Sequence, residues 1–226
     1  MRITLLCSCG LLLEQAGKSI LIDAPNGSLP PFYEFPNTEM ERLSDGTDGY
    51  GGLCGVFFTH LHPDHYDEAR VSALLRRRDA LTTFLPDWQT PEALVRTAGP
   101  FTVECRRFPH MPAPKFPDAA HYVLLVTAGA QSVYITADAV PDAEAHRRVL
   151  HGRMPQLAFW NSQSLSYPEM RALLREDTVE SAIYHMPVDP ADRSGIRRKC
   201  ERNMQRYGAE LQNVRVLTQY PSELEI

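Results

Sequence analysis

The chain has 226 residues, with 23 Lys and Arg against 28 Asp and Glu, which gives a net charge of −5 and a pI near 5.9. Its length fits one large domain over residues 1–226 with an ample core. The acidic balance argues against broad binding of nucleic-acid phosphates, which usually needs a basic face. No apolar run of 18 residues and no charged-then-apolar leader appears, so we expect a cytoplasmic protein without a membrane segment.

The opening of the chain reads as two strands, a turn at Gly17-Lys18 and a third apolar run, Ser19 to Asp23. Cys7 and Cys9 lie in the first part of this opening, before the turn at Gly17-Lys18. The five cysteines are odd in number and mostly occupy apolar contexts, so we interpret them as reduced, buried thiols. Two sulfurs without a second pair are an incomplete zinc set. We therefore expect core packing for Cys7 and Cys9.

Residues 25–52 form the main irregularity of the pattern, because prolines and glycines recur between four aromatic residues, Phe32, Tyr33, Phe35 and Tyr50. A connection this long in a compact domain usually serves function or contains a short helix. The segment leaves the strand that ends at Asp23. Its aromatic side chains are candidates for a pocket wall or for the contact of a homodimer. The alternative is an ordered loop packed on its own side chains.

The most informative motif is the run Thr59-His60-Leu61-His62-Pro63-Asp64-His65, which follows the apolar run Val56 to Phe58. A strand that ends and releases three imidazoles and a carboxylate into a loop is typical of a metal site. His60 and His62 can turn toward one cation, and Asp64 and His65 toward a second. Neutral imidazole with carboxylate suits zinc best and also admits iron or manganese.

Further ligands are expected where other strands end, which is where open α/β structures bind ligands. His110 follows the run Phe101 to Phe108, Asp138 follows Ser132 to Thr136, and His185 ends Ser181 to Tyr184. His121, which opens the run Tyr122 to Val126, is the rival for the role of His110, and its alternative interpretation is an exposed histidine at a strand edge. We expect His146 and His151 on the surface and Asp118 and Asp142 in turns or at helix starts.

Helical spacing or capping signals predict five helices. Together with the strands they indicate an α/β fold with two facing sheets and outer helices. A last strand is expected at Val214 to Leu217. The predicted helices are Tyr66 to Arg78, Pro91 to Thr97, Asp142 to Leu150, Tyr167 to Arg175 with Ser166 as its N-cap, and Asp189 to Tyr207.

The order and context of these ligands resemble the metallo-β-lactamase-fold hydrolase superfamily, from Arg2 to about Leu217. The resemblance implies a four-layer αββα sandwich of two mixed sheets. It also implies that Asp23 supports the metal loop from behind. Two cysteines in the first turn depart from the superfamily pattern and would reshape the floor of the site. The ligands that carry the resemblance are His60, His62, Asp64, His65, His110, Asp138 and His185.

Carried over to this chain, the resemblance implies that three histidines hold a first metal, that Asp64, His65 and His185 hold a second, and that Asp138 bridges the two. A hydroxide bound by both ions would be the nucleophile, with Asp64 and His185 in catalytic roles. No serine nucleophile elbow is present. The first metal would be held by His60, His62 and His110.

The superfamily carries many reactions, so the substrate is the open question. The stretch Tyr134 to Pro141 and the later run Gln156 to Trp160 are similar to the cyclic phosphodiesterase and ribonuclease Z branch, whereas the opening and the length are similar to ascorbate-6-phosphate lactonases. We expect a small, anionic phosphodiester first. The alternatives are a lactone or other ester, iron-dependent sulfur oxidation, and a metal-bound binding or sensor protein. Candidate substrate contacts are Lys115, Asn161, Ser162 and Arg193.

Overall fold

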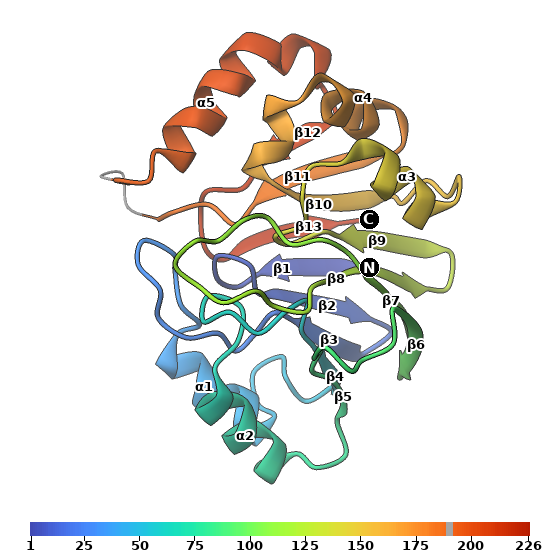
Figure 1. Cartoon of the computed structure of the whole chain (residues 1–226). Coiled ribbons are helices and arrows are strands. Elements are labelled where there is room, and N and C mark those ends of the chain that lie inside the picture. Colours follow the sequence, from blue (N-terminus) through green and yellow to red (C-terminus); the bar gives the residue numbers. More distant parts are fainter. Residues whose placement is uncertain (189–191) are drawn as a thin grey trace.

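The computed structural model describes residues 1–188 and 192–226, which form two facing β-sheets with helices on both outer faces (Figure 1). The predicted αββα sandwich is confirmed. Helices α1 (Asn37–Asp45) and α2 (Glu68–Arg77) cover one sheet. The other sheet is covered by α3 (Ala143–Leu150), α4 (Pro168–Glu176) and α5 (Ile196–Tyr207). No helix in the described part of the chain is long and apolar enough to cross a bilayer.

The first sheet has the order β13-β1-β2-β3-β4-β5, and its last three strands run parallel. The predicted opening forms three antiparallel strands, because Leu11 to Gln15 pairs with strands on both sides. The bounds are β1 (Arg2–Leu5), β2 (Leu11–Gln15), β3 (Lys18–Ile22), β4 (Leu53–Phe57), β5 (Thr82–Phe84) and β13 (Ser222–Glu225).

The second sheet has the order β12-β11-β10-β9-β8-β7-β6, parallel from β9 to β12 and antiparallel beyond. The short 3₁₀ turns η1 (Ser162–Ser166) and η2 (Gly208–Glu210) follow β10 and α5. The strands are β6 (Ala93–Ala98), β7 (Phe101–Arg107), β8 (Tyr122–Ala128), β9 (Gln131–Ile135), β10 (Leu157–Asn161), β11 (Glu180–Tyr184) and β12 (Val214–Val216).

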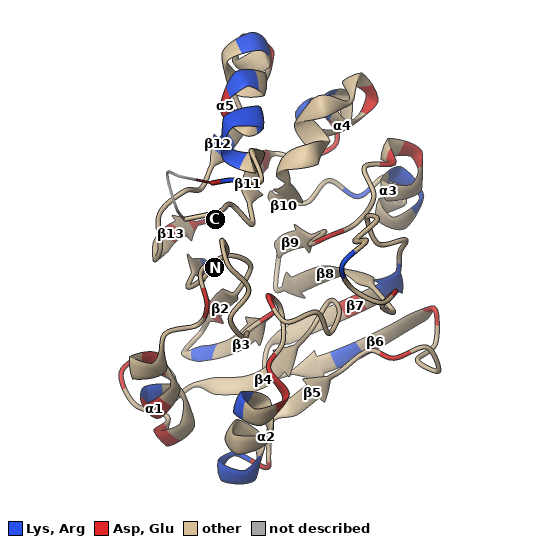
Figure 2. Ribbon diagram, turned by 60° about the vertical axis from the view of Figure 1, so that its left-hand side comes forward, with Lys and Arg blue, Asp and Glu red and all other residues tan. Residues whose placement is uncertain are grey.

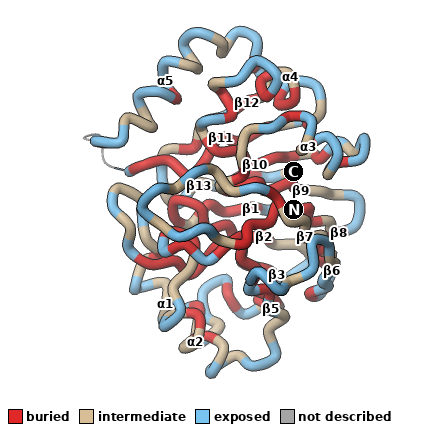
Figure 3. Tube along the Cα trace, viewed as in Figure 1, coloured by how far each residue is buried: buried red, intermediate tan, exposed pale blue. Residues whose placement is uncertain are grey.

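Three apolar layers hold the sandwich together, and Figure 3 shows the buried residues concentrated in the sheets. The central layer between the sheets includes Ile22, Phe57 and Val126. A second layer joins α3, α4 and α5 to their sheet, and a third joins α1 and α2 to theirs. Full burial of one such aliphatic or aromatic side chain stabilises the fold by roughly 1.5–3 kcal/mol. The layers fix the strand ends and thereby the loops that follow them.

Several predicted elements need correction. Pro91 to Thr97 is not a helix: Ala93–Ala98 is strand β6, and it pairs antiparallel with β7 along its whole length. The helix after Ser166 begins at Pro168, with Tyr167 in the N-cap position, and the Ser166 hydroxyl accepts a hydrogen bond from Asn203 instead. The last helix begins at Ile196. The start expected at Asp189 lies outside the described residues.

His146 was expected on the surface, but it lies on the buried face of α3. Its ring stacks on Phe108, with centroids 4.3 Å apart, and its Nδ1 lies 2.8 Å from the Tyr134 hydroxyl. Burial lowers the pKa of His146 to about 3. His151 is exposed and Asp142 caps α3, both as predicted.

Candidate metal centre

The seven predicted ligands meet at one edge of the sandwich, where strands of both sheets end. Parallel neighbours present their carboxyl ends on the same side, so β3, β4, β9 and β11 deliver Asp23, His60, Asp138 and His185 to one place. Three residues just past these strand ends are left-handed: Asp23, Ala137 and His185 have φ values of 50°, 46° and 57°. Such non-glycine conformations cost of the order of 1–3 kcal/mol each and concentrate at functional sites.

Three of the histidines form a first group, which we call the histidine site: His60, His62 and His110. The Nε2 atoms of His60 and His110 are 3.2 Å apart. The remaining ring nitrogens face hydrogen-bond partners of the protein: His62 Nε2 faces the Pro117 carbonyl at 3.0 Å, and His110 Nδ1 faces that of Met111. A carbonyl only accepts, so these nitrogens carry the hydrogen and the opposite nitrogens are left as free ligands.

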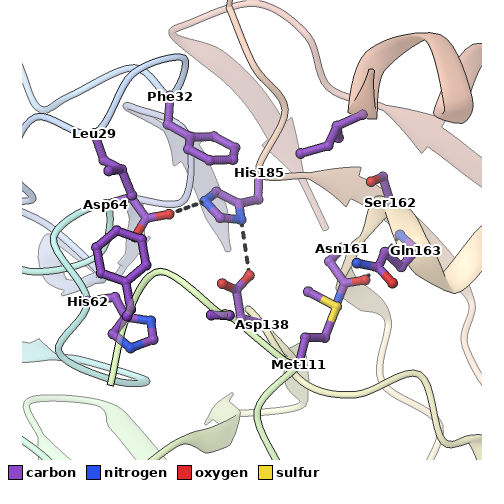
Figure 4. Close-up of a pocket in the computed structure, with 13 residues that line it drawn as sticks. Leu29, Phe32, His62, Asp64, Met111, Asp138, Asn161, Ser162, Gln163 and His185 are labelled. Atoms are coloured by element: carbon purple, nitrogen blue, oxygen red, sulfur yellow. Dashed lines mark hydrogen bonds and ion pairs between the residues drawn. The ribbon is translucent and has the colours of Figure 1, made fainter. Parts of the chain in front are cut away.

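The second group, the carboxylate site, consists of Asp64, His65 and His185, with Asp138 completing the set. His185 lies between the two carboxylates, with Nε2 3.1 Å from Asp64 Oδ2 and Nδ1 3.1 Å from Asp138 Oδ1 (Figure 4). Burial alone would lower the pKa of His185, but the charge of Asp138 and these hydrogen bonds raise it to about 10. Burial likewise opposes the ionised form of Asp138, yet His185 holds that carboxyl's pKa well below its ordinary value.

Asp138 lies between the two groups. Its Oδ2 is 3.9 Å from His60 Nε2 and 3.6 Å from His110 Nε2 on one side, and 3.8 Å from His65 Nε2 on the other. One carboxylate oxygen therefore faces both sites. This placement is compatible with the bridging role that the resemblance implies for Asp138.

Asp23 supports both groups from behind, fully buried. Its Oδ2 accepts hydrogen bonds from the Thr59 hydroxyl at 2.8 Å and from His65 Nδ1 at 3.0 Å, while Oδ1 accepts from the Thr59 amide at 2.7 Å. With its hydrogen donated to Asp23, the Thr59 oxygen faces His60 Nδ1 at 3.1 Å as an acceptor. Asp23 thus orients His65 directly and His60 through Thr59.

The donor set fits divalent metal ions. His65 Nε2 is buried without a hydrogen-bond partner among the described residues, and an unpaired buried nitrogen is costly unless something binds it. The facing Nε2 atoms of His60 and His110 likewise need a cation or a proton between them. Imidazole nitrogens with carboxylates suit Zn²⁺, and also Mn²⁺ or Fe²⁺.

Further His and Cys side chains lie close to the predicted ligands. His121 is buried beside His60, not exposed, and its Nδ1 faces the Phe108 carbonyl at 3.2 Å. It belongs to neither ligand group, whereas His110 does. Cys9 donates a hydrogen bond to the Asp64 carbonyl, and its sulfur lies near His65 and His185. All five cysteines are free, and all but the half-buried Cys54 are buried.

A cavity of about 200 Å³ opens onto the centre, and the walls around its ligands are largely apolar. Phe32 stacks on His185 with ring centroids 4.4 Å apart, and the ring centroids of Phe116 and His62 are 5.3 Å apart. Phe32 comes from the irregular segment 25–52, so the pocket-wall interpretation of that segment is supported. The full lining is Leu29, Phe32, His62, Asp64, Met111, Ala113, Phe116, Asp138, Asn161, Ser162, Gln163, His185 and Ile196.

The four predicted substrate contacts divide into two pairs. Asn161 and Ser162 line the cavity, whereas Lys115 and Arg193 are exposed and do not line it. The roles of Thr59 and Gln163 were not predicted from the sequence, whereas Phe32 was among the aromatic residues expected in a pocket wall. The position of Thr59, directly before the first histidine, was the one local signal for its role. Gln163 reaches the cavity only through the tertiary fold, and the sequence carries no sign of it.

No protein-family model matches the chain, and no curated protein matches it. Solved structures do match. The metallo-β-lactamase fold protein YhfI from Bacillus subtilis superposes with a TM-score of 0.66 at 15% identity, over 99% of this chain and 98% of that one. An isothiocyanate hydrolase from Delia radicum gut bacteria gives 0.64 at 16%, over 100% and 99%.

A further structure, a possible metal-dependent hydrolase from Veillonella parvula, gives a TM-score of 0.68 at 14% identity, over 100% of this chain and 99% of that one. Each of the three matches covers at least 98% of both chains, so both sheets are included. The protein therefore has the metallo-β-lactamase fold.

Proposed function

We propose that the protein is a hydrolase that depends on two divalent metal ions, most suitably zinc, with manganese or iron as alternatives. The observation that carries this proposal is the buried Nε2 of His65, which has no hydrogen-bond partner among the described residues and lies 4.0 Å and 3.8 Å from carboxylate oxygens of Asp64 and Asp138. His60, His62 and His110 would hold one ion, Asp64, His65 and His185 the other, and Asp138 both.

Bound ions of this kind activate water as a nucleophile and stabilise the negative charge that develops on the substrate. The protein's own part is to orient the substrate and move the proton. Asp64 and His185 line the cavity, and Asp64 Oδ2 lies 3.1 Å from His185 Nε2. They are therefore the groups that can hold a proton beside the bond that breaks.

The lining favours an uncharged carboxylic ester or lactone as substrate. Among the described residues that line the cavity, none is Lys or Arg. Lys and Arg residues lie elsewhere, for example along α5, as Figure 2 shows. Phe32 and Phe116 instead place apolar rings against His185 and His62. The isothiocyanate hydrolase among the similar structures is named for an uncharged substrate.

A small phosphodiester is the second candidate. The two metal ions supply positive charge of their own, so a phosphate would not need a Lys or Arg in the cavity wall. Under this alternative the anion preference comes from the metals alone.

Steady-state kinetics on a matched panel tests the proposal. Zinc-loaded protein should hydrolyse p-nitrophenyl acetate and a small lactone with a higher kcat/KM than bis-p-nitrophenyl phosphate. Phe32→Ala should raise KM for the neutral esters by about 10-fold, since a buried aromatic contact is worth roughly 0.5–1.5 kcal/mol beyond its area. Lys115→Ala is the matched control and should behave as wild type.

Two results would count against this assignment. A higher rate on the phosphodiester, with no effect of Phe32→Ala, would favour the second candidate. Metal-loaded protein that turns over none of these substrates would favour a metal-bound binding or sensor protein.

A further inference from the structure

Asp138 is the middle residue of the strained segment 137–139, which lies between β9 and α3. Ala137, just before it, is left-handed with φ 46°, a conformation that an alanine adopts only when its surroundings enforce it. The segment lies at the centre of the site, because Asp138 Oδ2 is within 3.9 Å of nitrogens from both ligand groups. Something must therefore hold this backbone in place.

Asn161, the last residue of β10, binds the segment on both sides of Asp138. Its Nδ2 donates hydrogen bonds to the carbonyls of Ala137 and Ala139, each at 3.0 Å. An amide nitrogen has two hydrogens, so these bonds use its full donor capacity. Its Oδ1 accepts a hydrogen bond from the backbone N–H of Gln163 at 3.2 Å, which fixes the orientation of the Asn161 side chain.

Neighbouring groups complete the support. The Tyr184 hydroxyl accepts a hydrogen bond from the Ala137 amide at 3.1 Å, and the Met111 amide donates to the Asp138 carbonyl at 2.8 Å. Tyr184 and Met111 are the chain neighbours of His185 and His110. The backbone around Asp138 is thus tied to the two strands or loops that carry those ligands, and Asn161 supplies the contacts to both flanking carbonyls.

We propose that Asn161 is a positioning residue that holds Asp138 between the two metal sites, and not a contact for the substrate. The inference rests on the proposed metal-dependent function. Although Asn161 borders the cavity, it is only 4% exposed and its donors are committed to the backbone (Figure 4). A small shift of the 137–139 backbone would carry the carboxylate away from one or both groups. The loss of a group that orients a metal ligand typically costs about 10–100-fold in metal affinity.

The test is Asn161→Asp, which keeps the shape but removes both donors and sets a carboxylate against two carbonyls. Asn161→Ala removes the donors without adding charge and serves if the first variant does not fold. The matched control is Asn213→Asp, because Asn213 also donates to a backbone carbonyl, that of Leu174 at 2.8 Å, away from the ligands. Thermal unfolding of the metal-free proteins reports on folding.

The readouts are the dissociation constants for Mn²⁺ and the electron paramagnetic resonance of the loaded protein, in which two ions that share one carboxylate are magnetically coupled. We expect Asn161→Asp to bind about 10–100-fold more weakly and to lose the coupling, with Asn213→Asp like wild type. A folded Asn161 variant with wild-type affinity and coupling would overturn the inference alone. Wild-type protein that binds no metal would overturn the proposed function, and the inference with it.

Discussion

The two halves of the candidate centre are built from different chemistry. The imidazoles of the histidine site are oriented by backbone carbonyls and by the Thr59 hydroxyl, all uncharged. Those of the carboxylate site are oriented by Asp23, Asp64 and Asp138. A cation in the carboxylate site meets negative charge in its ligands and behind them. We therefore expect that site to fill first, and Asp138 to couple it to the other.

Removal of the shared ligand should have the largest effect. Asp138→Ala takes away the one oxygen that faces both groups, so we expect both ions to bind at least about 100-fold more weakly and activity to fall in parallel. Elemental analysis after gel filtration measures the loss. His62→Ala is the comparison, because it should empty the histidine site and leave one ion per chain. Two tightly held ions in Asp138→Ala would contradict the bridging role.

The next largest effects concern Asp23 and Thr59, which orient the ligands, and these effects should differ between the two sites. Asp23→Asn disturbs His65 directly and His60 through Thr59, so affinity at both sites should fall about 10–100-fold. Thr59→Val removes the hydroxyl that faces His60 and its hydrogen bond to Asp23, but it keeps the bond between His65 and Asp23, so it should weaken the histidine site more than the carboxylate site. Isothermal titration with Zn²⁺ resolves the two steps. Equal losses at both sites in Thr59→Val would contradict a preferential effect of Thr59 on the histidine site, and an unchanged affinity there would show that the relay through Thr59 does not exist.

The acid stability of the fold away from the centre depends on His146. Burial lowers the pKa of His146 to about 3 from an ordinary 6.5. The unfolded chain therefore binds a proton below pH 6.5 that the folded chain refuses, and stability falls as the pH drops from 6.5 toward 3. The slope from this residue is about 1.4 kcal/mol per pH unit.

Denaturant unfolding of metal-free protein at pH 6, 5 and 4 measures that slope. His146→Gln removes the titrating ring, so its unfolding free energy should depend less steeply on pH than that of wild type. Exposed His151, replaced in the same way, is the control and should leave the slope unchanged. Parallel pH profiles for wild type and His146→Gln would contradict the buried, neutral state of this histidine.

The sequence predicted the fold and the clustering of the ligands because both depend on local rules. Apolar runs mark strands, and ligands follow where strands end, as at His60, Asp138 and His185. The two wrong interpretations near β7 depend instead on tertiary packing. Residues 91–97 join the sheet because β7 offers a free edge, and His146 is buried because α3 packs against Phe108. A single sequence displays neither partner.

The cavity shows the same limit. Lys115 and Arg193 were expected near the substrate because they follow His110 and His185 in the chain, yet both side chains are exposed and outside the lining. Asn161 was expected to meet the substrate because it ends a strand at the right edge, but its amide binds backbone carbonyls. Closeness in sequence to a ligand does not determine where a side chain points, since the turn after each strand does.

The most direct test of the central claim is the metal content of the wild-type protein, measured by elemental analysis and by titration of the metal-free chain with Zn²⁺. We expect two ions per chain that bind in two resolved steps, the tighter at the carboxylate site and therefore the one lost in His65→Ala. Fewer than two ions after full reconstitution, or a tighter step that survives His65→Ala and disappears in His62→Ala, would contradict this claim.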